Sequence, residues 1–199
     1  MHNAQYHALH AMGAELNDLL LVSGSRVQPT ATLEGAADDG GAVDASNCTF
    51  ENGVAALDGG AIAITDGLLT LIDSVFTNNT AGRNGGAMHV AGGVVSCVAC
   101  TFSANAAAGL GGGVHASGGV VSLGNQTLLV ANSAPGGSNS LHVTTGGSVT
   151  YTLPTPLGRW VYSASSAYET VSGSVASDYP FSCSAGLYGN GLGAPHQNG

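Results

Sequence analysis

The repeat that decides the fold is clearest in Gly85-Gly86-Ala87-Met88-His89-Val90, which returns 26 positions later (111 − 85) as Gly111-Gly112-Gly113-Val114-His115-Ala116. The same spacing separates three phenylalanines and one leucine: Phe50, Phe76, Phe102 and Leu128. A fixed period of this length indicates one structural unit that is written several times, as in solenoid proteins.

Other positions share this period. Two apolar columns and one hydroxyl column recur: Leu69, Val95 and Val121; Leu71, Cys97 and Leu123; Thr70, Ser96 and Ser122. Downstream, Ser140-Leu141-His142-Val143 is a degraded copy that stands one residue late. Upstream, Gly59-Gly60-Ala61-Ile62 and Gly40-Gly41-Ala42-Val43 carry the Gly-Gly element, but Ala42 and Ala61 are only 19 positions apart (61 − 42). We therefore predict that the first copy lacks about seven positions, roughly one strand.

Within each unit the residues alternate as in β-strands. Met88 and Val90 are expected to face inward and His89 outward, and Cys100 and Phe102 inward. The Gly-Gly pairs and four asparagines supply turns, because both residue types tolerate left-handed backbone. These asparagines are Asn78, Asn79, Asn105 and Asn132. Three short strands and three turns fit one coil, so the sequence predicts an all-β parallel β-helix of about four to five coils.

Stacked coils place equivalent residues about 4.8 Å apart, so the inward columns are expected to form one continuous core. These columns are Phe50/Phe76/Phe102/Leu128, Leu69/Val95/Val121 and Ile62/Met88/Val114/Leu141. Burial of each phenylalanine contributes roughly 1.5–3 kcal/mol.

The composition excludes several classes of protein. Glycine makes up 32 of 199 residues without a three-residue period, which excludes collagen. A hydrophobic content of 44% excludes a disordered polar chain. With no lysine and a net charge of −9, nucleic acid and anionic membranes are poor partners. The run Leu19-Leu20-Leu21-Val22 is too short to span a bilayer, and we expect no transmembrane segment and no cofactor.

Three regions are predicted. Residues 1–34 form an N-terminal cap, with a short helix over residues 4–21 that covers the first coil. Residues 35–153 carry the β-helix repeats. Residues 154–199 form an irregular tail that ends like the start of a Cys-rich module, so we expect the chain to be part of a longer one. Its start shows no signal peptide.

Two motifs occur once per unit: Gly-Gly-Ala-Ile, at Gly59-Gly60-Ala61-Ile62, and Phe-x-x-Asn, at Phe76-Thr77-Asn78-Asn79 and Phe102-Ser103-Ala104-Asn105. Their pairing at fixed phase over residues 38–143 resembles the polymorphic outer membrane protein (Pmp) repeats of chlamydial autotransporters. Phe50-Glu51-Asn52-Gly53 departs from the motif, with its Asn one place early. The resemblance implies a right-handed β-helix of the pectin-lyase-like type, exposed at a cell surface and used in adhesion. The tail looks more like the surface proteins of algae and other protists, in which similar repeats occur.

His89, His115 and His142 share one outward strand position in successive units. Stacked about 4.8 Å apart, their imidazoles are weak candidates for a shared divalent metal. We favour a solvent-facing histidine ladder without metal, because no carboxylate column adjoins it in the repeat. A stacked ladder predicts that acid destabilises these coils as the imidazoles become charged.

Acidic residues offer two further hypotheses. Asp39, Asp58 and Asn84 precede successive Gly-Gly pairs and present oxygens that suit Ca²⁺, but tight turns explain them more simply. A polysaccharide lyase or glycosidase is the main alternative function, and a glycosidase needs two carboxylates about 5–10 Å apart. A lyase needs a base such as Lys or Arg, and Arg83 is the only strong cation in the repeat, so we assign no catalytic residue.

Three N-glycosylation patterns begin at Asn47, Asn78 and Asn125, and Asn47 and Asn125 are predicted to share a register. Such patterns mildly favour a secreted protein. Cys48 and Cys100 are predicted to occupy one column two coils apart, about 9–10 Å, which disfavours a disulfide. Cys97 stands in a leucine column and is predicted to be a core residue.

Together these features predict a non-catalytic cell-surface or secreted protein with a structural or adhesive role. Its expected partners are surface glycans or host and other cell-surface proteins. The rivals are a glycan-active β-helix enzyme and a fragment of a larger surface protein without a function of its own.

Overall fold

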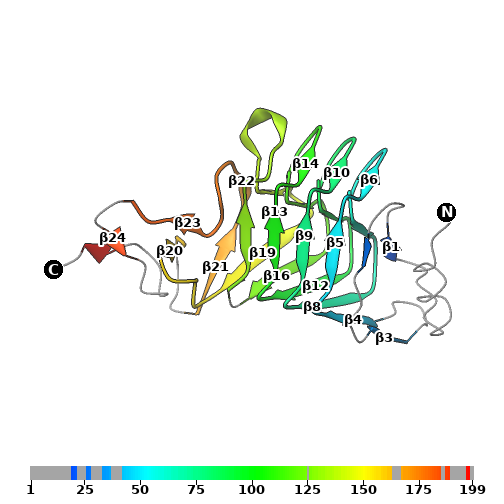
Figure 1. Ribbon diagram of the computed structural model, residues 1–199, viewed down its shortest axis with the longest axis horizontal. Coiled ribbons are helices and arrows are strands. Elements are labelled where there is room, and N and C mark those ends of the chain that lie inside the picture. The colour runs from blue at the N-terminus through cyan, green and yellow to red at the C-terminus, as the bar shows by residue number, and fades with distance from the viewer. Residues whose placement is uncertain are drawn as a thin grey trace.

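The computed structural model describes residues 19–21, 26–27, 33–36, 42–124, 126–162, 167–184, 187–188 and 196–197. Side chains are described for residues 42–124, 126–162 and 167–184. Strands from successive coils lie side by side along the long axis of the molecule (Figure 1). Among the described residues, no helix is long and apolar enough to cross a membrane.

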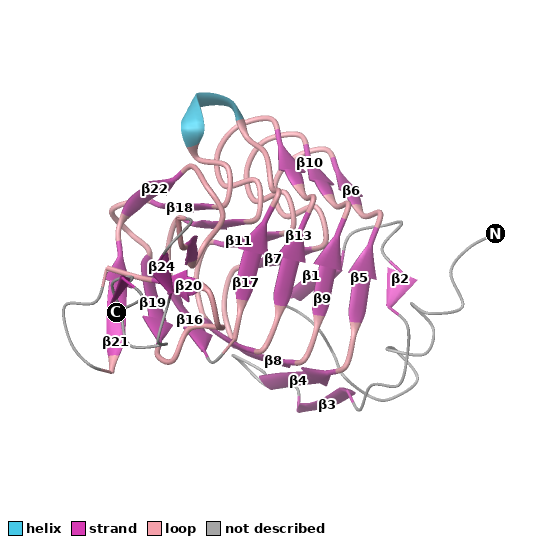
Figure 2. Ribbon diagram, turned by 60° about the vertical axis from the view of Figure 1, so that its left-hand side comes forward, coloured by secondary structure: helices cyan, strands magenta, loops and turns pink. Residues whose placement is uncertain are grey.

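The coils from β7 to β10 and from β11 to β14 each run through four short strands, one more than predicted, and each of these strands belongs to a different sheet (Figures 1 and 2). Sheet A holds β7 (Ile62–Ile64), β11 (Met88–Val90), β15 (Val114–Ala116) and β18 (Leu141–Val143). Sheet C holds β4 (Ala42–Ser46), β8 (Leu68–Ile72), β12 (Val94–Val98), β16 (Val120–Gly124) and β19 (Ser148–Thr152). Sheet B holds β5 (Thr49–Glu51), β9 (Val75–Thr77), β13 (Thr101–Ser103) and β17 (Leu128–Val130). Sheet D holds the added two-residue strands β6 (Val54–Ala55), β10 (Thr80–Ala81) and β14 (Ala106–Ala107).

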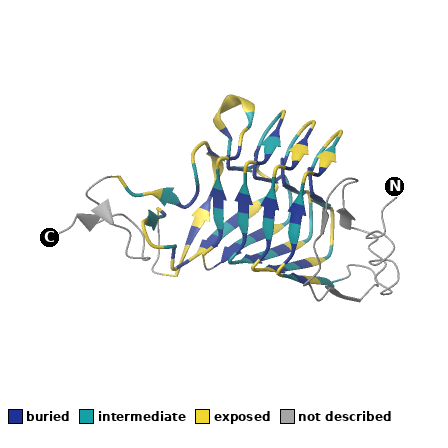
Figure 3. Cartoon of the chain, viewed as in Figure 1, coloured by how far each residue is buried: buried dark blue, intermediate teal, exposed yellow. Residues whose placement is uncertain are grey.

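Neighbouring coils pair in parallel with the predicted period. Val94 of β12 pairs with Leu68 of β8 and with Val120 of β16, so each step is 26 positions (94 − 68 and 120 − 94). The predicted all-β parallel solenoid is confirmed, with about 4 turns of about 26 residues. Buried and partly buried residues alternate along the strands, and exposed residues gather at the turns (Figure 3).

The two glycines of the Gly85-Gly86 pair have different roles. Gly85 has a φ of 67°, a left-handed backbone that glycine adopts without strain. A Cβ on Gly86 would lie 2.1 Å from the carbonyl oxygen of Gly112 in the next coil. The second glycine is therefore required because the backbones of successive coils approach closely at this corner.

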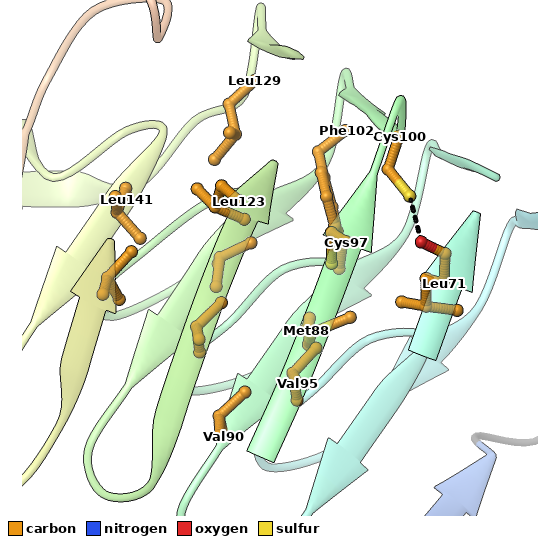
Figure 4. Packing of buried hydrophobic residues seen from close by; sticks show 14 of the residues in the cluster. Leu71, Met88, Val90, Val95, Cys97, Cys100, Phe102, Leu123, Leu129 and Leu141 are labelled. Carbon is orange, nitrogen blue, oxygen red and sulfur yellow. Dashed lines mark hydrogen bonds between the residues drawn. The ribbon is translucent and has the colours of Figure 1, made fainter. Parts of the chain in front are cut away.

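The inward columns form one continuous core (Figure 4). Phe76 stacks between Phe50 and Phe102, with ring centroids 4.5 Å apart on each side and interplanar angles of 4° and 7°. The predicted Ile62/Met88/Val114/Leu141 and Leu69/Val95/Val121 columns are confirmed by their strand pairing and burial. Stacking within the column gives the Phe76 ring a flat apolar neighbour on each side, at a separation that stacked aromatic rings prefer.

The fourth member of the phenylalanine column is Leu129, and the prediction of Leu128 is wrong. Phe102 pairs with Leu129, which is fully buried, whereas Leu128 is half-buried. Leu123 still follows Cys97 by one period (123 − 97), but Leu129 follows Phe102 by one position more (129 − 102), so one residue is inserted at the corner between β16 and β17. Beyond this corner the period no longer predicts which side chain points inward.

The first coil is complete over sheets C, B and D, and the predicted seven-residue deletion is wrong. Ala42 pairs with Leu68, and Phe50 with Phe76, so both steps are one full period. The stretch Gly40-Gly41-Ala42-Val43 therefore is no copy of Gly59-Gly60-Ala61-Ile62, since Val43 shares a column with Leu69. The sequence match to Gly59-Gly60 failed because glycine pairs also occur at a second corner of the coil, as in Gly92-Gly93.

Antiparallel strands pair with the first coils. They are β1 (Leu19–Leu21) on β7, β2 (Arg26–Val27) on β5 and β3 (Leu33–Ala36) on β4. At Leu19–Leu21 the prediction of a helix over residues 4–21 is therefore wrong, while residues 4–18 lie outside the described residues. A reversed strand satisfies the edge hydrogen bonds of a coil without presenting a further parallel edge.

Antiparallel strands also pair with the last coils. β21 (Tyr168–Val171) pairs with β19, and β22 (Gly173–Val175) pairs with β18. The 3-10 turn η1 (Pro135–Gly137) precedes β18. The predicted tail also contains the paired strands β20 (Arg159–Trp160) with β23 (Phe181–Ser182), and β24 (Leu187–Tyr188) with β25 (His196–Gln197).

A ladder of buried asparagines lies beside the phenylalanine stack. Asn79, Asn105 and Asn132 are at most 6% exposed, although we predicted them as turn residues. The Asn105 Nδ2 donates to Asn132 Oδ1 (2.9 Å) and to the Phe76 carbonyl oxygen (3.0 Å). Its Oδ1 accepts from the Asn79 backbone N–H and side-chain Nδ2, both at 3.0 Å. The left-handed turn position belongs instead to the preceding residue, as at Asn78 (φ 55°).

The cysteines of the solenoid are buried free thiols. Cys97 is fully buried in the Leu71/Leu123 column, as predicted. Cys48 and Cys100 are buried free thiols two coils apart, and Ser74 lies between them, with its Oγ accepting from the Cys48 N–H (3.2 Å). Thr127 takes the position after Cys100, and its hydroxyl accepts from the Cys100 N–H (3.3 Å).

Candidate functional site

The outer face of sheet A carries the predicted histidine ladder. His89, His115 and His142 occupy the central positions of β11, β15 and β18 and pair directly with one another. Their ring centroids are 5.0 and 5.4 Å apart, with interplanar angles of 21° and 23°. The register of the parallel strands thus stacks three imidazoles in one column.

The three histidines have different surroundings. His89 Nε2 lies 3.0 Å from the Ser117 hydroxyl, and His142 Nδ1 lies 2.7 Å from the hydroxyl of Ser174 on β22. His115 is only 3% exposed, and neither of its ring nitrogens has a hydrogen-bond partner. The expectation of a wholly solvent-facing ladder is therefore wrong at its centre, because the rings of His89 and His142 cover both faces of His115.

Burial controls the charge of this ladder. Desolvation, together with a smaller effect of the neighbouring histidines, lowers the pKa of His115 from 6.5 to about 4. Desolvation also lowers the pKa values of His89 and His142. All three imidazoles are therefore neutral at pH 7, which allows them to stack without repulsion.

Acid is expected to destabilise the protein through His115. Because its pKa is lower in the folded than in the unfolded chain, its contribution to stability is complete above pH 6.5 and is lost as the pH falls towards 4. Between pH 7 and pH 5 the loss amounts to about 2 kcal/mol. The charged or titratable groups that act on His115 are His89, His142, Asp58 and Arg83.

The check is the urea midpoint of unfolding at pH 7, 6 and 5. A His115→Phe variant keeps an aromatic ring in the stack and should show a smaller fall over this range. An unchanged midpoint in the wild-type protein would contradict close stacking of neutral imidazoles.

Asp58 connects the ladder to a turn of the preceding coil. It forms an ion pair with Arg83, whose guanidinium contacts both carboxylate oxygens, and its Oδ1 accepts the Asn84 N–H (3.0 Å). The hydrogen bond from Arg83 is the main reason why the pKa of Asp58 is lowered. Its Oδ2 lies 3.7 Å from His89 Nδ1, so one carboxylate adjoins the first histidine of the ladder, and Asn84 takes the equivalent position in the next coil.

The column of Asp58 and Asn84 supports the turn interpretation over calcium binding. Asn84 Oδ1 accepts the Leu110 N–H (3.0 Å), as Asp58 does one coil earlier with Asn84. Asp39 lies outside the described residues. Among the described residues, no group of three or more His, Cys, Asp or Glu side chains is arranged to hold a metal ion, and the histidine ladder is not such a group.

Two of the three glycosylation candidates, Asn47 and Asn78, lie at exposed corners. Asn47 and Asn78 are exposed and have φ values of 53° and 55°. Asn125 lies outside the described residues. Gln126, with φ 66°, takes the left-handed position that Asn47 has in its own coil, because of the residue inserted at that corner. The predicted shared register of Asn47 and Asn125 stays a prediction.

The outer face of sheet C is a second candidate surface. A central column of hydroxyl side chains crosses it: Thr70, Ser96, Ser122 and Thr150. Beside this column run Leu68, Val94 and Val120, which are 41, 43 and 45% exposed. From β8 to β16 the face therefore presents uncharged hydroxyl and aliphatic groups in straight rows, and the exposed Asp44 of β4 precedes Thr70 in the hydroxyl column.

No protein-family model, curated protein or solved structure matches this chain. The assignment of a site therefore depends on the geometry described above. Sequence reasoning found the histidine column but missed the contacts of His89 with Ser117 and Asp58. These residues lie 28 and 31 positions from His89 (117 − 89 and 89 − 58). The one signal for these contacts in the sequence is a separation slightly longer than one period.

Proposed function

We propose that this protein is a solenoid of a cell surface or secreted matrix with a structural or adhesive role, and that it binds surface glycans, without turning them over, through the outer face of sheet C. The regular outer face of sheet C carries the proposal. The likeness of its motifs to Pmp repeats, which implies a right-handed β-helix of pectin-lyase-like type, also supports it.

The chemistry of this face suits a polysaccharide. Sugar chains present hydroxyl groups beside apolar C–H faces, and the Thr70/Ser96/Ser122 column lies beside the partly exposed Leu68/Val94/Val120 column. The hydroxyl column can exchange hydrogen bonds with sugar hydroxyls, while the aliphatic column removes apolar surface from water. Coils about 4.8 Å apart repeat the same contacts along a polymer, so weak contacts add along one chain.

A glycan array combined with a depolymerisation screen on the purified chain tests this proposal. We expect binding without turnover. A Ser96→Asp variant places a charge in the middle of the hydroxyl column and should weaken binding at least about tenfold, or ~1.4 kcal/mol.

Thr101→Asp is the matched control, because Thr101 is also a half-buried strand residue of the same coil but lies on sheet B. Equal binding by both variants would remove sheet C from the proposal. Turnover of a polysaccharide would favour a glycan-active enzyme instead. Asp58 is poorly suited to the general acid of such an enzyme, because that role requires a raised carboxyl pKa and the pKa of Asp58 is lowered.

A further inference from the structure

A serine hydroxyl, an imidazole and a carboxylate lie next to one another, in this order, on the outer side of sheet A. Ser117 directly follows β15, and its Oγ lies 3.0 Å from His89 Nε2. The same hydroxyl lies 3.5 Å from the Val90 carbonyl oxygen, a much weaker contact. The better acceptor for the Ser117 proton is therefore the imidazole of His89.

The second ring nitrogen of His89 faces an anion. His89 Nδ1 lies 3.7 Å from Asp58 Oδ2, and the side chains of His89 and Asp58 are 13% and 11% exposed. This distance is longer than a hydrogen bond, so Asp58 acts on the ring as a nearby charge. A carboxylate at this place favours the tautomer with the proton on Nδ1, which leaves the Nε2 lone pair for Ser117.

The charge states at neutral pH agree with this tautomer. Arg83 holds the pKa of Asp58 below its ordinary value, so the carboxylate is ionised. Desolvation lowers the pKa of His89 and outweighs the opposite effect of Asp58, so the imidazole is neutral. A neutral imidazole beside a hydroxyl is the arrangement that general-base activation of serine requires.

The next coil provides an internal comparison. The positions of Asp58, His89 and Ser117 recur there as Asn84, His115 and Thr144. With an amide in place of the carboxylate, neither ring nitrogen of His115 has a hydrogen-bond partner. Within the described coils, the carboxylate, the imidazole and the primary hydroxyl therefore occur together once. Their combination is not explained by the repeat, because the equivalent positions of the next coil carry an amide and a secondary hydroxyl.

We propose that Ser117, His89 and Asp58 form a nucleophilic serine site that accepts the acyl group of an activated ester. The Ser117 oxygen attacks the ester carbonyl carbon while its proton passes to His89 Nε2. The tetrahedral intermediate collapses, the bond to the leaving oxygen breaks, and His89 returns the proton to the departing alcohol or phenol. Water, deprotonated by the same nitrogen, then releases the carboxylic acid and restores the Ser117 hydroxyl.

The backbone around Ser117 limits the class of substrate. The N–H groups of Ser117 and Gly118 both donate to the Val90 carbonyl oxygen, at 2.8 and 3.2 Å. These groups therefore cannot serve as donors to a developing oxyanion, which in other enzymes accelerates the reaction by ~10²–10³ per donor. Esters with good leaving groups, such as aryl esters, need this assistance least and are the expected substrates.

Labelling of the full chain with a fluorophosphonate, followed by peptide mass spectrometry, tests this inference. We expect a stoichiometric adduct on Ser117 and competition by p-nitrophenyl acetate. A His89→Gln variant keeps a hydrogen-bonding side chain but lacks the base, and should label at least about 100-fold more slowly. Ser103→Ala, a serine replacement on β13 of sheet B, should label at the wild-type rate.

The labelling rate of the wild-type protein should also fall as the pH drops through the pKa of His89, below 6.5. A merely structural contact between Ser117 and His89 would give no such profile. Each variant is first compared with the wild type by its urea midpoint, and Asp58→Asn serves as a second slow variant if His89→Gln does not fold. The absence of an adduct on Ser117, or equal rates for the wild type and the folded slow variant, would overturn the inference. Because the glycan-binding face lies on sheet C, either proposal can fail without the other.

Discussion

Replacing Phe76 with alanine is expected to lower the free energy of unfolding by about 3–5 kcal/mol. The Phe76 side chain is fully buried and stacks on Phe50 and Phe102, with ring centroids 4.5 Å away on each side. Its removal leaves a cavity that the neighbouring rings cannot fill, because parallel strands on both sides fix the coil spacing. A domain of this size is typically stable by only about 5–15 kcal/mol, so the loss is a large share of the total.

Urea unfolding of two further variants provides the controls. Phe76→Leu keeps most of the volume, and Leu129 already occupies this column, so we expect a loss below about 1.5 kcal/mol. Phe181→Ala removes a half-buried ring outside the stack and should cost clearly less than Phe76→Ala. Equal losses for Phe76→Ala and Phe181→Ala would contradict the account of the core.

Replacing Asn105 with alanine is expected to cost about 3–6 kcal/mol, although the side chain is small and polar. The Asn105 side chain makes four hydrogen bonds, with Asn79, Asn132 and the Phe76 carbonyl oxygen. All of these groups are buried. The variant removes the side-chain acceptor of the Asn79 backbone N–H and one hydrogen bond each from Asn79 Nδ2, Asn132 Oδ1 and the Phe76 carbonyl oxygen. Each such group costs about 1–3 kcal/mol.

The matched control is Asn78→Gly in the preceding coil. Asn78 is exposed and has a left-handed backbone that glycine also adopts, so its replacement should change stability by less than about 1 kcal/mol. Urea midpoints with m-values measure both variants. Similar small losses would show that the ladder contributes little, and that Asn105 has only the turn role that the sequence suggested.

The period of the sequence predicts the core well because burial constrains both size and polarity. The inward columns that build the core of the central coils are mostly apolar, and the repeat of Phe50, Phe76 and Phe102 follows directly from stacking at 4.5 Å. Prediction failed where the period changes. One residue inserted before Leu129 shifts the inward position by one, and apolar residues stand at both candidate positions.

Polar positions were harder to predict, because the same residue type serves different purposes. Asn78 and Asn79 are adjacent in the sequence, yet the first supplies a turn at the surface and the second a buried ladder. His89 contacts Ser117 diagonally across neighbouring coils, because Ser117 lies two positions after His115, the direct pairing partner of His89. Such a diagonal can be recognised only when strand register and side-chain direction are both known.

The measurement that tests the in-register stack most directly is a proton NOE spectrum of the protein labelled only at phenylalanine. The chain has four phenylalanines, so the ring signals can be assigned by single replacement. Ring protons of Phe76 should show strong cross-peaks to the ring protons of Phe50 and to those of Phe102, whose ring centroids each lie 4.5 Å away. We expect no cross-peaks between Phe50 and Phe102, because the Phe76 ring lies between them. Absence of the cross-peaks from Phe76 to its two neighbours in the folded protein would contradict the stacked solenoid.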